Sequence, residues 1–157
     1  MPSKGGLIIQ PAWLISESSN EPKQNWGVRV YDGKIQSVAP NEELETKFSE
    51  DEIFLAKDKV LMPGFVNGHI HMYGVLAHGI PVKSAPSDFW SFLEKFWWPL
   101  VEDRIDHEMI SAATDWSCSE MLLTGTTTFC DILEAPQSLP ESLILEKEII
   151  ENRGLRA

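Results

Sequence analysis

The sequence contains little cysteine and little histidine, and it has no long hydrophobic run. Its 157 residues include two cysteines and four histidines. Cys118 and Cys130 show no paired spacing, so we expect buried thiols in a reducing compartment rather than a disulfide framework. No apolar stretch approaches the roughly 20 residues that span a bilayer, which predicts a protein outside the membrane. Residues 1–6 lack the apolar region of a signal peptide, so we expect a cytoplasmic location.

Positive charge is also scarce in this chain. Thirteen lysines and arginines face 24 aspartates and glutamates, which gives a formal net charge of −11. An acidic surface repels nucleic acid and anionic lipid, so we expect neither as a partner. A hydrophobic fraction of 43% with 24% charged residues is typical of a folded globular protein.

Residues 1–62 contain several short apolar runs that predict β-strands. Two of these runs, 26–31 and 34–38, flank Asp32 and Gly33. An Asp-Gly pair between two alternating runs favours a tight hairpin turn, because such turns need residues that accept positive φ. The acidic segment 41–52 is predicted to be a solvated connection between strands.

After Pro63 the sequence changes to an alternation of strands and helices. Asp106 is the expected N-cap of a helix that ends at Gly125, and Ser138 with Glu141 resembles a capping box for a second helix. This order predicts an α/β fold with a parallel sheet and helices outside it. The expected elements are a strand at 65–71, an irregular aromatic segment at 73–105, a helix at 107–124, a strand at 126–133, a helix at 139–153 and a beginning strand at 155–157.

Two of the four histidines, His69 and His71, lie one residue apart at the end of the first of these strands. Strand alternation places them on one face together with Asn67, at the carboxyl end where α/β folds build their sites. Their Cα atoms are then about 6.6–6.8 Å apart, which lets both rings reach one metal ion. A bare His-x-His pair also occurs on surface edge strands. In a buried strand, however, two unpaired imidazoles would be costly, so we interpret the pair as metal ligands.

The stretch from Val60 to His71, VLMPGFVNGHIH, resembles the first barrel strand of the amidohydrolase superfamily. It is most similar to the branch of cytosine, guanine and adenosylhomocysteine deaminases and triazine chlorohydrolases, and Asn67 stands where other branches carry aspartate. Residues 7–61 resemble the β-sandwich part of that family, and 120–131 resemble its next helix end and strand. The resemblance implies a small β-sandwich portion at 1–62 and, at 63–157, the first βα units of a (β/α)₈ TIM barrel.

The same resemblance implies a metal-dependent hydrolase of C–N bonds other than peptide bonds, most simply a deaminase of an aminated heterocycle that uses metal-activated water. His69 and His71 would bind one divalent ion, zinc or alternatively iron. Asn67 and Asp131 would support these ligands, although a hydrogen bond at the barrel rim is an equal reading for Asp131. The acid and base groups of the family have no counterpart in this chain. A chlorohydrolase, a cyclic amidase and a non-catalytic structural relative remain alternatives.

The segment 73–105 is much longer than an ordinary βα loop of about 2–6 residues. Long loops at the carboxyl end of barrel strands shape substrate pockets, so Trp97 and Trp98 are candidates to stack on a planar nitrogen heterocycle. For most aromatics in this segment we favour the alternative, in which they bury a helical excursion. Glu102 resembles the substrate-contacting glutamate of the deaminase branch. One extra residue separates it from Pro99, and a surface glutamate is the alternative.

A closed barrel of this type needs about 250 residues, and too few follow Pro63 to complete one. We therefore expect this chain to be the N-terminal portion of a longer enzyme, or to pair with a complementary chain. On its own we expect it to be inactive. By analogy with the family, we also expect the complete protein to form a homo-oligomer.

Overall fold

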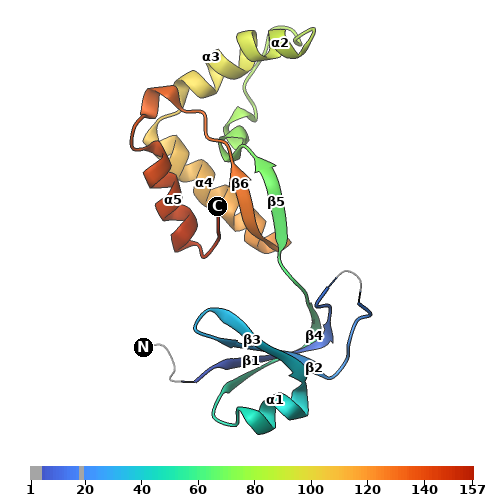
Figure 1. The fold of residues 1–157 in the computed structure, drawn as a ribbon. Helices are drawn as coiled ribbons and strands as arrows, with labels where there is room; N and C mark the ends of the chain where they lie inside the picture. The colour runs from blue at the N-terminus through green and yellow to red at the C-terminus, as the bar shows by residue number, and fades with distance from the viewer. Residues whose placement is uncertain (1–4, 18–19) are drawn as a thin grey trace. The chain divides into compact units, whose positions relative to one another are not determined.

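The computed structural model describes residues 5–17 and 20–157. The chain divides into two compact units, Met1–Pro63 and Gly64–Ala157 (Figure 1). Among the described residues, no helix combines the length and the apolar character that crossing a bilayer requires.

The first unit is built on a four-stranded sheet with the order β3-β2-β1-β4. The central strand β1 (Leu7–Leu14) pairs antiparallel with β2 (Trp26–Tyr31) and parallel with β4 (Glu52–Leu61). Strand β3 (Lys34–Pro40) pairs antiparallel with β2. The described residues of this unit form one sheet, and a sandwich needs two, so the β-sandwich stays a prediction.

The turn between β2 and β3 is the predicted hairpin. Asp32 and Gly33 have φ values of 51° and 68°, as a tight turn between twisted antiparallel strands requires. The two flanking strands pair from Tyr31 with Lys34 to Trp26 with Pro40. The local sequence signal therefore placed this element correctly.

The acidic segment after β3 is not a plain connection, and that prediction was wrong. Helix α1 (Asn41–Lys47) occupies it, and Leu44 is only 1% exposed in a core with Ile8 and Ala39. Glu42 and Glu43 stand in its first turn, where negative charge suits the helix dipole. Leu44 is the buried residue of this helix, so its apolar signal is lost among the acidic residues.

The second unit places two parallel strands beside two helices (Figure 1). Strand β5 (Phe65–Ile70) pairs with β6 (Thr126–Asp131), and Arg156 forms a further parallel bridge to Thr128 of β6. Helices α4 (His107–Thr124) and α5 (Ser142–Asn152) pack against each other. The βα order matches the sequence expectation, while the closed barrel stays a prediction. One core lies between these elements, and its buried residues are Met72, Cys118, Met121, Phe129, Ile150 and Leu155.

The two helices differ in how well their starts were predicted. For α4, the Asp106 side chain accepts the Met109 N–H at 2.8 Å and Gly125 ends the helix with φ 86°, as expected. For α5, the predicted capping box was wrong. The Ser138 hydroxyl donates instead to the Ile105 carbonyl at 2.5 Å, and the helix starts later.

Strand β5 is more exposed than the sequence suggested. Val66 is 72% exposed and Phe65 is also exposed, whereas Ile70 packs on the core. Strand β6 pairs with one edge of β5, and no described strand pairs with the other edge of β5. The apolar run is therefore buried only where it meets the helices.

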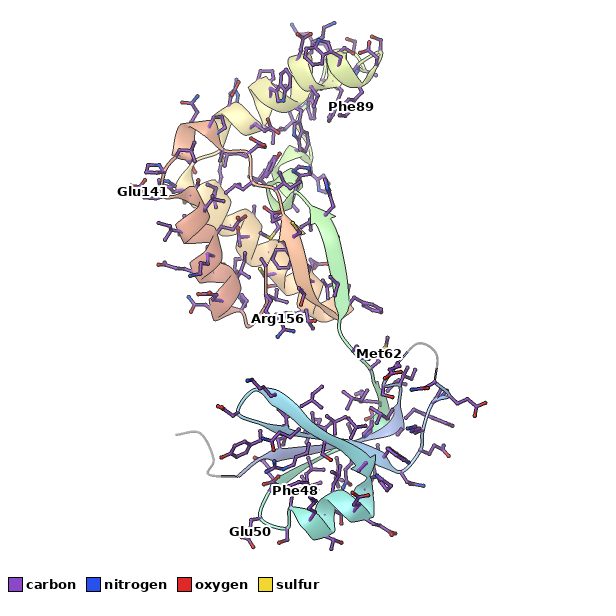
Figure 2. All side chains as sticks on the ribbon, viewed as in Figure 1. Phe48, Glu50, Met62, Phe89, Glu141 and Arg156 are labelled. Carbon is purple, nitrogen blue, oxygen red and sulfur yellow. The ribbon has the colours of Figure 1, made fainter. Side chains whose placement is uncertain are left out.

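The long aromatic segment is largely helical. Its first turn packs inward through Tyr73, in a core with Val101, Ile105, Ile110 and Ala135, and Phe96 and Trp97 lean on this core. Farther out, Phe89 projects into solvent at the tip of the segment (Figure 2). The helical stretches are η1 (Met72–Ala77), α2 (Phe89–Phe92), η2 (Leu93–Trp97), α3 (Trp98–Leu100) and η3 (Glu102–Arg104).

Candidate metal and substrate site

The side chains of His69 and His71 converge at the carboxyl end of β5. Their Nε2 atoms lie 3.2 Å apart, and their rings meet edge to face with centroids 5.0 Å apart. Two nitrogens that bind one tetrahedral ion at about 2.0–2.1 Å are separated by about 3.4 Å. The observed separation therefore fits two ligands of a single ion.

A backbone carbonyl fixes the orientation of His71. Its Nδ1 lies 2.9 Å from the Ile132 carbonyl oxygen, just beyond β6. A carbonyl only accepts, so Nδ1 carries the proton and Nε2 keeps a free lone pair directed toward His69. Metal-binding histidines are commonly held in this way through their second nitrogen. The same stretch is also tied by the Ile132 N–H, which donates to the Ile70 carbonyl at 3.0 Å.

Asn67 and Asp131 bind the backbone next to the two histidines. The Asn67 Oδ1 accepts the His69 N–H at 3.2 Å, and the Asp131 Oδ1 accepts the Met72 N–H at 2.8 Å. Burial raises the pKa of the Asp131 carboxyl, while the Met72 N–H acts in the opposite direction. Both residues thus hydrogen-bond to the backbone of the segment that carries the two histidines.

The two histidines stand without further ligands in the described part of the chain. Within residues 5–17 and 20–157, no group of three or more histidine, cysteine, aspartate or glutamate side chains is arranged to hold a metal ion. His78 lies at the end of η1 and is exposed, and the ring of His107 pairs with the Ser138 carbonyl at 2.9 Å. The pair supplies half of a four-coordinate site.

A cavity of about 510 Å³ opens beside His71. The predicted substrate residues Trp97, Trp98 and Glu102 all line it. Trp97 has a second role, because its ring centroid lies 5.8 Å from that of Tyr73 and its side chain packs against the core around Tyr73. The remaining lining residues are Phe89, Phe92, Leu93 and Glu134.

Tyr73 links this cavity to the histidine pair, and the sequence reasoning missed it. Its side chain is 1% exposed, its ring meets that of His71 at 5.6 Å, and its hydroxyl donates to Glu102 Oε1 at 2.8 Å. Burial and the neighbouring Glu102 raise the pKa of the Tyr73 hydroxyl, so it stays a donor at neutral pH. Its position two residues after His71 was the available signal, and nothing in the sequence connects Tyr73 with Glu102.

Comparison with known proteins identifies similar chains and folds. The model of the amidohydrolase family matches residues 60–152. A 5-methylthioadenosine/S-adenosylhomocysteine deaminase from Thermodesulfovibrio yellowstonii is 32% identical over 80% of this chain and 29% of its own length. A 5'-deoxyadenosine deaminase from Methanosarcina mazei is 32% identical over 80% of this chain and 28% of its own length. The chain thus spans less than a third of these relatives.

Solved structures with the same fold cover nearly all of this chain. A zinc-bound adenosine deaminase from Xanthomonas campestris superimposes with a TM-score of 0.80 at 24% identity, over 98% of this chain and 33% of its own. A mutant atrazine chlorohydrolase from Arthrobacter aurescens, complexed with zinc and atraton, gives a TM-score of 0.72 at 19% identity, over 96% of this chain and 34% of its own. At these identities the similarity establishes the fold alone.

Proposed function

Because the chain belongs to the amidohydrolase family, we propose that it is the N-terminal part of a metal-dependent hydrolase of C–N bonds other than peptide bonds. The leading activity is deamination of an aminated heterocycle. The matched residues include β5, the long helical segment, α4 and β6. The named relatives are deaminases of adenosine-like compounds, which favours the same class of reaction here.

The convergence of His69 and His71 carries the proposal. Two Nε2 atoms 3.2 Å apart, one of them with its lone pair fixed by the bond to Ile132, suit a zinc or iron ion. Such an ion, when bound, lowers the pKa of water and provides a nucleophile near neutral pH. The protein's own part is to hold both ligands in place. The Asn67 side chain accepts the His69 backbone N–H, and the Ile132 carbonyl accepts the proton of the His71 ring.

The cavity beside His71 suits a planar nitrogen heterocycle. Trp97 and Trp98 offer aromatic faces for stacking, and Glu102 offers a carboxylate for substrate N–H or O–H groups. The Tyr73 hydroxyl occupies Glu102 Oε1, so Oε2 is the oxygen left for a substrate. An adenosine-like molecule has both a planar ring and hydroxyl donors, which agrees with the names of the relatives.

We further propose that the remaining strands, ligands and acid–base groups lie outside these 157 residues. The parallel pairing of β5, β6 and Arg156 is the start of a sheet that can continue around a barrel. The remainder would belong to the same chain or to a complementary one. The small β unit would then be part of a sandwich, as the family resemblance implies.

The test uses the protein expressed from its complete reading frame. Metal content and ammonia release from 5'-deoxyadenosine are measured for the wild type, for His69→Ala with His71→Ala, and for the control His78→Ala. We expect about one equivalent of transition metal and ammonia release in the wild type and the control, and loss of both in the double variant. Chloride release from a chlorotriazine without ammonia from any aminated heterocycle would overturn the deaminase assignment. A wild type with neither metal nor activity would overturn the hydrolase proposal and favour a non-catalytic relative.

A further inference from the structure

The buried carboxyl group of Glu146 and the half-buried one of Asp131 line the same cavity. Asp131 comes from the end of β6. Glu146 comes from the middle of α5, and it is 6% exposed. The cavity lies between β6 and α5, and the two residues are close enough for each carboxyl group to shift the pKa of the other.

The two oxygens of Asp131 have different surroundings. Oδ1 accepts the Met72 N–H at 2.8 Å. Oδ2 is fully buried and receives no N–H or hydroxyl proton from the described residues. Two ionised carboxylates can only accept, so Asp131 and Glu146 can hydrogen-bond to each other only when one of them carries a proton.

Several titratable side chains lie near the two carboxyl groups, but no described residue forms an ion pair with either of them. His71 acts on Asp131, and Lys147, Glu151 and Arg156 line the same cavity. Asp115 and Arg153 lie, like the pair, near Cys118. Arg153 pairs with Asp115 at 2.5 Å, and Lys147 pairs with Glu151 at 3.6 Å. Within residues 5–17 and 20–157, neither Asp131 nor Glu146 takes part in an ion pair.

The proton belongs to Glu146 rather than Asp131. Asp131 already accepts the Met72 N–H, which favours its charged form, whereas Glu146 receives no such donor. Burial, together with the negative charge of Asp131, raises the pKa of the Glu146 carboxyl to about 8. At neutral pH Glu146 is therefore the donor and Asp131 the acceptor.

We infer that Glu146 is a positioning residue for the histidine pair. As a neutral acid, it donates its proton to Asp131 Oδ2 and holds the Asp131 side chain against the Met72 N–H. Met72 directly follows His71, and Ile132, which binds the His71 ring, directly follows Asp131. Glu146 therefore acts through Asp131 on two backbone positions next to His71. One is the Met72 N–H, and the other is the Ile132 carbonyl that binds the His71 ring.

The first test examines the proton itself and needs neither metal nor activity. The infrared carbonyl stretch of a protonated carboxyl is resolved from those of carboxylates. In the metal-free full-length protein at pH 7, we expect one such band that disappears in Glu146→Gln and persists in Glu148→Gln, an exposed glutamate of the same helix. A spectrum without this band, or a band that survives Glu146→Gln, would overturn the assignment.

The second test examines positioning, and this part rests on the proposed metal site. Zinc affinity is measured by chelator competition for Glu146→Gln, Glu146→Leu and the control Glu148→Gln. The glutamine amide donates to Asp131 without a titrating proton, so its affinity should stay near that of wild type. Leucine removes the donor and should weaken zinc binding about tenfold, the lower end of the effect of outer partners on metal sites.

The unfolding temperature of each variant separates positioning from stability. Leucine leaves Asp131 Oδ2 buried without a donor, which is expected to lower the unfolding temperature. Zinc affinity is therefore measured well below the unfolding temperature of every variant, where a lower affinity reports the site alone. Wild-type affinity in Glu146→Leu, or an equal loss in both Glu146 variants, would overturn the positioning role. If the wild type binds no zinc, the proposed function and the positioning role both fail, while the infrared result still decides where the proton lies.

Discussion

The Tyr73 hydroxyl donates a hydrogen bond to Glu102 Oε1 at 2.8 Å, across 29 residues of sequence. Tyr73 is buried, whereas Glu102 lies in a short 3₁₀ turn at the cavity. The bond therefore fixes a carboxylate that would otherwise be free to rotate. It also couples the cavity wall to His71, whose ring Tyr73 contacts.

Replacing Tyr73 with phenylalanine should weaken substrate binding more than it slows the chemical step. The ring and its packing stay, but Glu102 loses its donor, so we expect KM to rise about tenfold with a smaller change in kcat. Steady-state kinetics of the full-length protein checks this. Tyr31→Phe, at an exposed tyrosine of the first unit, is the matched control and should leave both constants unchanged. A fall in kcat at constant KM would contradict the role given to Glu102.

Asn67 should affect metal binding through the backbone of His69. Its Oδ1 accepts the His69 N–H, so Asn67→Ala removes a constraint on one ligand without removing the ligand itself. We expect zinc affinity to fall about tenfold, as for other partners behind metal ligands. Chelator competition measures the change, with His78→Ala as a control that should bind zinc like the wild type. An unchanged affinity in Asn67→Ala would show that the hydrogen bond does not hold the ligand.

Much of the second unit was predictable because its signals are local. The helix from His107 to Thr124 carries its own start in Asp106 and its own stop in Gly125. The approach of His69 and His71 follows from the alternation of side chains along one strand. Neither inference needs knowledge of what lies elsewhere in the chain.

Other features depend on contacts between distant segments, which a single sequence does not reveal. The bond of Tyr73 to Glu102 and the pair of Asp131 with Glu146 join separate elements. Ser138 matched a capping pattern, yet its hydroxyl donates to the Ile105 carbonyl, which the fold brings within hydrogen-bond distance. Such outcomes are decided by tertiary packing, which overrides local preference.

Gly64 should be intolerant of a side chain because of its distance to β6. A Cβ atom at this position would lie 2.2 Å from Oγ1 and 2.8 Å from Cβ of Thr127. Gly64→Ala forces the start of β5 away from β6, and we expect a loss of about 1–3 kcal/mol in the free energy of unfolding. Thr127→Ala removes the two closest atoms and should partly rescue it. A double-mutant cycle by denaturant unfolding measures the coupling, and purely additive effects would exclude this clash.

The ion pair of Arg29 with Asp51 should stabilise the first unit in a pH-dependent way. The side chains are 10% and 6% exposed, the guanidinium lies 2.5 Å from the carboxylate, and the Gly6 N–H donates to Asp51 at 2.7 Å. Removing the charge in Asp51→Asn leaves Arg29 buried with a weaker partner, so we expect a loss of about 3 kcal/mol at pH 7. Hydrogen exchange of the β2 backbone amides reports this loss for the first unit.

The sign of the pH dependence follows from the hydrogen bond to Arg29, which holds the pKa of Asp51 below its ordinary value. The stabilisation is therefore fully present above the ordinary pKa of about 4 and is lost as the pH falls through the lowered value of the folded state. In Asp51→Asn the stability of the first unit should therefore depend less on pH in this acidic range. Asp58→Asn, at an exposed aspartate paired with Lys59 at 2.8 Å, is the control and should change the profile little, because water screens that pair. Equal profiles for wild type and Asp51→Asn would contradict the buried ion pair as the source of acid sensitivity.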